Sequence, residues 1–143
     1  MAIAQAVANS FKKEILEGIH DLESGGDTFQ LALYTSVATL SSATTSYTTS
    51  SEVAASGEYA AGGGVLQSQQ VSLATGGVAI VDFADLSFTG VTLTARGALI
   101  YNTTEAKKAV CVLDFGSDKT ATSGTFTIQF PQFNSSSAIL RIA

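Results

Sequence analysis

The feature that most constrains the fold of this chain is a series of short runs in which apolar and polar residues alternate. In the two clearest runs, Phe29–Tyr34 and Thr125–Phe130, every second side chain is large and apolar. A period of two is typical of a β-strand that buries one face. No second stretch with helical periodicity follows the N-terminal segment to join parallel strands. The sequence therefore predicts a mainly β fold, an antiparallel β-sandwich or barrel of about seven or eight strands with one N-terminal amphipathic α-helix.

The other expected strands are short and are separated by turn residues. They lie at residues 65–66, 71–73, 78–83, 86–88, 91–95, 98–101, 109–115 and 138–142, with the first two of these paired. Gly97 is expected to mark a bulge between two of the runs. The expected core consists of aliphatic residues at alternating positions: Leu31, Leu33, Ile80, Leu93, Leu99, Val112, Leu113, Ile128 and Leu140. A chain of 143 residues is expected to form a single domain, residues 1–143.

Residues 2–17 form the one segment with helical periodicity. Apolar residues recur every four positions between Ile3 and Ile15, which places them on one face of a helix. Gly18 follows, and glycine commonly ends a helix in the left-handed conformation. An amphipathic helix of this kind covers either its own sheet or a neighbouring subunit, and both interpretations stay open.

Side chains suited to catalysis are scarce in this chain. It has one histidine, one cysteine, no tryptophan, and seven lysines and arginines, against 17 serines and 17 threonines. Enzymes cluster titratable groups to activate nucleophiles or to move protons. Cys111 lies in an apolar run and is expected to be buried and inert, whereas His20 is expected to be exposed just after the helix. We therefore expect a protein that is not an enzyme, with no catalytic residue and no cofactor.

The glycine and aspartate patterns do not predict a ligand site. Gly62–Gly64 lacks the lysine and the following helix of a phosphate-binding loop, and it predicts a turn. The aspartates of the strand region lack the spacing of a calcium loop: Asp82, Asp85, Asp114 and Asp118. We expect these carboxylates to lie at strand ends and in turns. The alternative is that two of them converge and bind a hard cation. Asp82 and Asp114 lie in apolar runs, so we expect Arg96 to pair with one of them and no metal site.

The charge balance bears on the class of partner. A net charge of −5 and a pI near 4.6 argue against binding to nucleic acid, whose phosphates require lysine and arginine. No apolar run approaches the about 20 residues that span a bilayer. The charges at Lys12–Glu14 follow the N-terminal apolar stretch, whereas a secretory signal begins with its charges. We expect no nucleic-acid partner, no membrane partner, and synthesis in the cytoplasm.

Residues 35–64 form a long excursion that is rich in serine, threonine and alanine. It contains only two charged residues, Glu52 and Glu58. Ordering such a segment costs conformational entropy, which contacts with another protein would offset. Charged residues make up 13% of the chain, about half the usual share, and a weakly charged surface suits packing against protein. The residues expected to contact a partner lie in this excursion and in the helix: Val7, Phe11, Tyr47, Val53 and Tyr59.

The order of several motifs along the chain carries a resemblance to a known family. The motifs are Phe11–Gly18, Asp27–Thr35, Tyr47–Thr49, Glu52–Val53, Gly57–Gly63, Arg96–Asn102, Val110–Gly116 and Thr125–Pro131. In this order they resemble a family of small virion structural proteins of tailed bacteriophages, over nearly the whole chain. The resemblance implies a capsid decoration or cement protein on the outer surface of the assembled shell, made in the host cytoplasm. It implies no catalytic residues.

The implied partners are the major capsid protein or other virion proteins, together with further copies of this chain. A homo-oligomer is expected, and a trimer is favoured by analogy with shell symmetry. Two alternatives stay open. One is a virion protein of the neck, tail or fibre. The other is a carbohydrate-binding module for host surfaces, for which the chain offers only Tyr34, Tyr47, Tyr59 and Tyr101 as tyrosine platforms.

Overall fold

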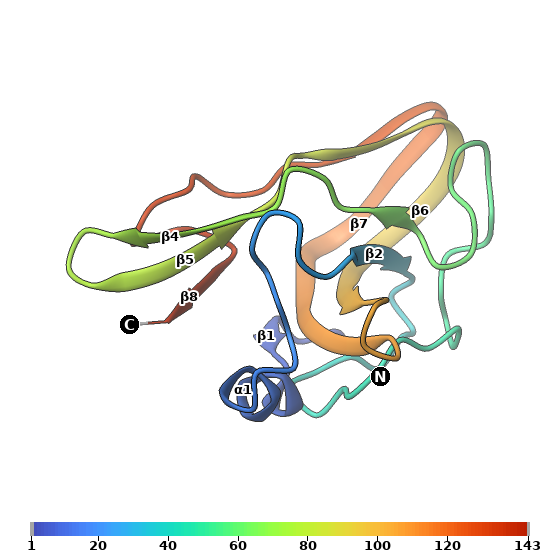
Figure 1. The fold of residues 1–143 in the computed structure, drawn as a ribbon. Helices are drawn as coiled ribbons and strands as arrows, with labels where there is room; N and C mark the ends of the chain where they lie inside the picture. The colour runs from blue at the N-terminus through green and yellow to red at the C-terminus, as the bar shows by residue number, and fades with distance from the viewer. Residues whose placement is uncertain (1, 143) are drawn as a thin grey trace.

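In a computed structural model that describes residues 2–142, the chain forms two antiparallel sheets and one helix (Figure 1). The larger sheet has five strands in the order β1 (Ala6–Val7), β7 (Lys108–Ile128), β6 (Leu86–Asn102), β2 (Phe29–Tyr34) and β3 (Gly64–Val65). The smaller sheet has three strands in the order β4 (Gln70–Ala74), β5 (Val78–Asp82) and β8 (Leu140–Ile142). The predicted fold class is confirmed, because the structure is mainly β and sandwich-like, with eight strands and one N-terminal helix.

Strands β6 and β7 are long and bent, and they form most of the larger sheet (Figure 1). Strand β6 unites three of the predicted strands, and β7 unites two. The ladder between them shifts register at four places, so the pair bends without ending. One shift lies between Ala95 and Gly97, which confirms the predicted bulge. A Cβ atom at Gly97 would lie 2.5 Å from the carbonyl oxygen of Leu113, so glycine also permits a close approach of the two strands.

The helix is shorter than the predicted residues 2–17. Helix α1 spans Asn9–Leu16, and the residues before it are extended. Strand β1 pairs with β7, and Ile3 forms a bridge with Leu40. The apolar residues before Asn9 alternate with alanine, so their pattern fits a strand as well as a helix. Pairing with the edge of β7 satisfies their backbone groups and decides in favour of the strand.

The C-terminal end of α1 agrees with the prediction. Gly18 has a φ of +74°, in the left-handed region. Its amide donates to the carbonyl oxygen of Ile15 at 3.2 Å, and the amide of Ile19 donates to that of Glu14 at 3.0 Å. This pair of bonds is the Schellman arrangement that satisfies the last carbonyl groups of a helix.

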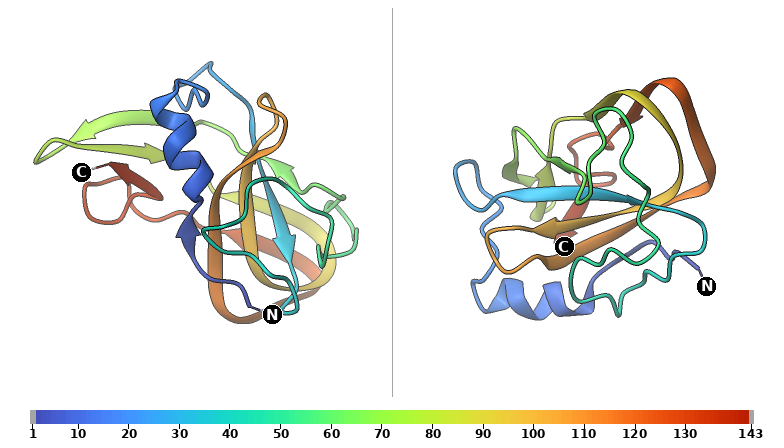
Figure 2. Two further views of the ribbon diagram at one scale, coloured as in Figure 1. Left: turned by 90° about the horizontal axis from the view of Figure 1, so that it is seen from below. Right: turned by 90° about the vertical axis from the view of Figure 1, so that its right-hand side faces the viewer.

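Strand β2 lies inside the larger sheet, between β6 and β3, and both of its faces are buried. Its alternation predicted burial of Phe29, Leu31 and Leu33 on one face, but Ala32 and Tyr34 are buried as well. The second face is covered because the excursion between β2 and β3 passes over the sheet (Figure 2). Eight of the nine predicted core residues are buried, and the ninth, Leu113, is half-buried.

The smaller sheet is built around the β4–β5 hairpin, which projects from the rest of the molecule (Figures 1 and 2). The predicted pairing of residues 65–66 with residues 71–73 is wrong, because β3 pairs with β2 and β4 pairs with β5. The segment between β3 and β4 carries the chain from the larger sheet to the smaller sheet. It is too short to form, in addition, a hairpin that would pair the two strands. Val81 and Leu140 of the smaller sheet still belong to the same hydrophobic core as the larger sheet.

Candidate functional site

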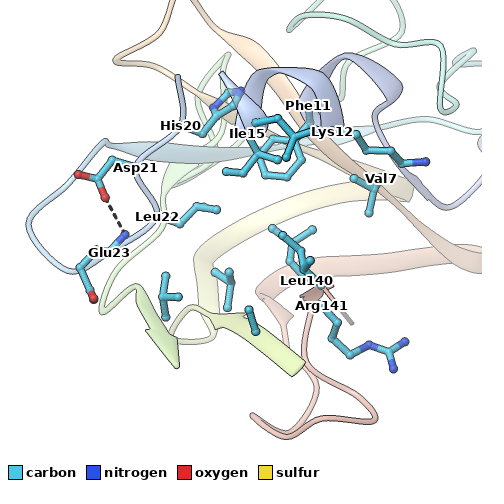
Figure 3. Close-up of a pocket in the computed structure, with 15 residues that line it drawn as sticks. Val7, Phe11, Lys12, Ile15, His20, Asp21, Leu22, Glu23, Leu140 and Arg141 are labelled. Carbon is cyan, nitrogen blue, oxygen red and sulfur yellow. Dashed lines mark hydrogen bonds between the residues drawn. The ribbon is translucent and has the colours of Figure 1, made fainter. Parts of the chain in front are cut away.

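A groove of about 620 Å³ lies between α1 and the smaller sheet (Figure 3). Phe11 and Ile15 line it from the helix. Val71, Val81 and Leu140 line it from the sheet, where strand pairing places them side by side on one face. The two sets of apolar side chains face each other across the groove (Figure 3).

The groove is apolar and open to solvent. Leu16 at its helical wall is 89% exposed, and Ile142 on its floor is 58% exposed. Leu73, two positions after Val71 and therefore on the same face of β4, extends the apolar floor and is 72% exposed. An exposed apolar surface of this kind is typical of a site that binds another macromolecule.

Charged residues of opposite sign lie at the two ends of the groove. Asp21 and Glu23 lie at one end, whereas Lys12 lies at the other (Figure 3). Electrostatic complementarity contributes more to orientation and specificity than to affinity. The groove can therefore bind an apolar segment in one preferred direction.

His20, predicted to be exposed, is buried beside the groove. Its Nε2 lies 2.8 Å from Glu14 Oε1, and its Nδ1 lies 2.9 Å from Asn102 Nδ2. Oδ1 of Asn102 accepts the amides of Thr104 and Glu105, which assigns Nδ2 as the donor toward His20. A neutral imidazole with its proton on Nε2 satisfies both contacts, so His20 ties α1 to the β6–β7 turn.

Glu52 anchors the excursion. Its Oε1 accepts the hydroxyl of Tyr47 at 2.5 Å, and its Oε2 accepts the hydroxyl of Tyr59 at 2.8 Å and the amide of Gly62 at 2.7 Å. The ring of Tyr47 stacks on Tyr101 with the ring centroids 4.7 Å apart. The excursion is therefore attached to the larger sheet of its own chain at several points.

The other two tyrosines complete this polar cluster. The hydroxyl of Tyr34 donates to the carbonyl oxygen of Thr48 at 2.6 Å, and that of Tyr101 donates to the carbonyl oxygen of Gly62 at 2.6 Å. Burial raises the pKa of Tyr101 to about 12 and raises the pKa of Tyr34 further. These hydroxyl groups therefore stay protonated and act as structural hydrogen-bond donors.

The five predicted contact residues are placed in different surroundings. Val7 and Phe11 line the groove, although Phe11 itself is buried. Tyr47 is half-buried in the tyrosine cluster, and Val53 and Tyr59 are buried against the chain's own sheet. Phe11, Val53 and Tyr59 thus do not offer their side chains to a partner, because intramolecular packing already covers them.

The aspartates do not form the predicted pairing with Arg96. The guanidinium of Arg96 lies 3.4 Å from Asp118, in an exposed pair on the β6–β7 ladder. Asp114 is exposed and accepts a backbone amide, as does Asp85, so neither requires a cation. Across residues 2–142, no three histidine, cysteine, aspartate or glutamate side chains converge as a metal site would require.

Cys111 is buried, as predicted, at the position where β7 pairs with β1. Burial raises the pKa of its thiol to about 12. The thiolate needed for nucleophilic chemistry is therefore strongly disfavoured at neutral pH.

No family model, curated protein or solved structure matches the chain. In the part of the chain that the structure describes, no helix is both long and apolar enough to cross a membrane.

Sequence reasoning missed the groove because its walls come from segments far apart in the chain. One signal was present: apolar residues alternate in the two outer strands of the smaller sheet, β4 and β8, at Val71, Leu73, Leu140 and Ile142, whereas β5 is apolar throughout residues 78–81. The alternation predicts one apolar face, but the lack of a covering layer over part of that face is visible only in the structure.

Proposed function

We propose that this protein is a non-enzymatic structural component of a phage virion, a capsid decoration protein that binds and stabilises the outer surface of the assembled shell. The observation that carries the proposal is the open apolar groove, with Leu16 and Ile142 left in water in the isolated chain. Burying these side chains against a partner removes apolar surface from water, which favours association. The resemblance of the motifs to small virion proteins supplies the context of the particle.

The partner in this proposal is the major capsid protein, through an apolar segment that enters the groove. Asp21 and Glu23 favour basic residues at one end of that segment, and Lys12 favours an acidic residue at the other. The sparsely charged surface of this chain adds uncharged rim contacts.

Binding to bare shells tests the proposal. Ile142→Asp places a charge on the groove floor and is expected to weaken decoration at least about tenfold, because a buried unpaired charge is costly. Val37→Asp is the matched control, because Val37 is exposed to a similar extent, 57%, but lies in the excursion. Circular dichroism would confirm that both variants fold. Equal decoration by Ile142→Asp and the parent would overturn the role of the groove.

Copy number separates the proposal from its nearest alternative. A reconstruction of the parent particle is expected to show hundreds of copies on the shell, whereas a dozen or fewer would indicate a neck or tail protein. The carbohydrate-binding alternative gains no support from the tyrosines. Tyr34, Tyr59 and Tyr101 are buried, and Tyr47 is half-buried against Tyr101.

A further inference from the structure

Strand β4 is an edge strand that is exposed on both faces. The order of the smaller sheet gives it a single partner, β5, in residues 2–142. Four of its residues, Gln70–Leu73, are exposed, and Ala74 is half-buried. An edge strand of this kind presents backbone N–H and C=O groups that a further strand can pair with.

This edge lacks the features that normally prevent association. Its ladder with β5 runs without a register shift from Gln70 to Ala74, so no bulge distorts it. The strand contains neither proline nor lysine, and residues 59–81 contain no charged residue at all. The other sheet edges, β1, β3 and β8, are only two or three residues long. Residues 113–128 of β7 also lack a second partner strand, but that edge carries Asp114, Asp118 and Lys119, and its ladder with β6 shifts register. Within the described chain, β4 is thus the extended edge that is both regular and uncharged, which predicts that another strand covers it.

The strand is complementary to itself. In an antiparallel pair centred on Ser72, Val71 of one copy lies opposite Leu73 of the other, on the same face of the sheet. Gln70 lies opposite Ala74 in this register. Two apolar cross-strand pairs result, and each such pair stabilises a sheet.

Electrostatics favours approach through the same hairpin. Each copy carries a net charge of −5, so two copies repel each other over most of their surfaces. Only one of the 12 acidic residues, Asp82 at the last position of β5, lies in the β4–β5 hairpin, and none lies in residues 59–81, so the projecting hairpin is where two copies meet with least repulsion. A two-fold arrangement, in which both copies use the same patch, is also the commonest symmetry of soluble oligomers.

We propose that β4 pairs with β4 of a second copy of this chain, antiparallel about Ser72, to form a two-fold dimer with a continuous six-stranded sheet. The pairing uses the edge of the sheet and leaves the groove faces open. The inference does not depend on the proposed function, since the dimer forms whether or not a capsid is the partner.

Analytical ultracentrifugation of the full chain over a range of concentrations tests the dimer. The parent is expected to sediment as a monomer–dimer equilibrium. Leu73→Lys is expected to raise the dimer dissociation constant at least about tenfold, because it replaces both apolar cross-strand pairs with edge lysines. Val37→Lys is the matched control and is expected to dimerise like the parent. A parent that stays monomeric, a parent that forms trimers, or an unchanged Leu73→Lys dimer would each overturn the proposal.

A thiol cross-linking experiment tests the register. Ser72→Cys places two cysteines opposite each other at the two-fold axis, and a short bismaleimide is expected to link them. Gln70→Cys separates the two thiols by about 13 Å along the strands and is expected to cross-link poorly. The native Cys111 is buried and contributes no background. Equal cross-linking of the two variants would exclude pairing about Ser72.

Discussion

Glu52 shows how one residue can organise a long irregular segment. It is the only charged residue between Asp27 and Glu58, and its carboxylate accepts three hydrogen bonds. Two of the donors are the hydroxyls of Tyr47 and Tyr59, so one side chain ties together distant parts of the excursion. A carboxylate with no other charged residue in the preceding 24 positions was a sequence signal for this role.

Glu52→Gln is expected to lower the free energy of unfolding by about 1–3 kcal/mol, because hydrogen bonds to a charged acceptor are lost and an amide donor meets other donors. Chemical denaturation monitored by circular dichroism measures the change. Glu17→Gln is the matched control, because Glu17 is exposed and pairs only with Lys13. The anchoring role of Glu52 would be contradicted if the two variants unfolded at the same denaturant concentration.

At the scale of elements, the return of the excursion to the sheet depends on Gly63. Its φ is +85°, and a Cβ atom there would overlap the carbonyl oxygen of Leu31 on β2. The next residue, Gly64, pairs with Leu31 in the β2–β3 ladder. Only glycine permits both the left-handed backbone and the close approach of the two strands.

Gly63→Ala is expected to destabilise the fold by more than the about 1–2 kcal/mol that a left-handed alanine costs alone, because the backbone of β2 must also move. Gly76→Ala in the β4–β5 turn isolates the conformational cost, since Gly76 has a φ of +83° and a Cβ atom there would have no neighbour within 4 Å. Thermal unfolding of the two variants would be compared with that of the parent. Equal losses would show that the contact with Leu31 is unimportant.

At the scale of the whole molecule, the buried tyrosine hydroxyls make stability depend on alkaline pH. Burial raises the pKa of Tyr101 from its ordinary value of 10.0 to about 12. At pH values between 10.0 and about 12, the Tyr101 hydroxyl is deprotonated in the unfolded chain but still protonated in the folded chain. The stabilisation is therefore complete below about pH 10 and is lost as the pH rises toward about 12.

We expect the free energy of unfolding to fall above about pH 10, and tyrosinate absorbance to rise together with the loss of structure. Tyr101→Phe is expected to show a smaller fall over the same range, whatever its stability at neutral pH. Tyrosine ionisation near pH 10 with the circular dichroism spectrum unchanged would contradict this account.

The sequence by itself determined the fold class and the positions of most of the core. A period of two places alternate side chains on opposite faces of any strand, so Leu31, Leu99 and Val112 were predictable core residues before their partners were known. The end of α1 just before Gly18 was predictable for the same kind of reason, because the signal is local.

Only the tertiary structure decided which apolar faces are covered and which elements cover them. Residues 2–8 have a pattern that fits helix or strand, and pairing with β7 selected the strand. Burial of His20 and attachment of the excursion through Glu52 depend on contacts between segments far apart in the chain. The groove follows from the relative placement of α1 and the smaller sheet. Local periodicity shows which face of an element is apolar, but the chain's three-dimensional path determines whether that face is covered.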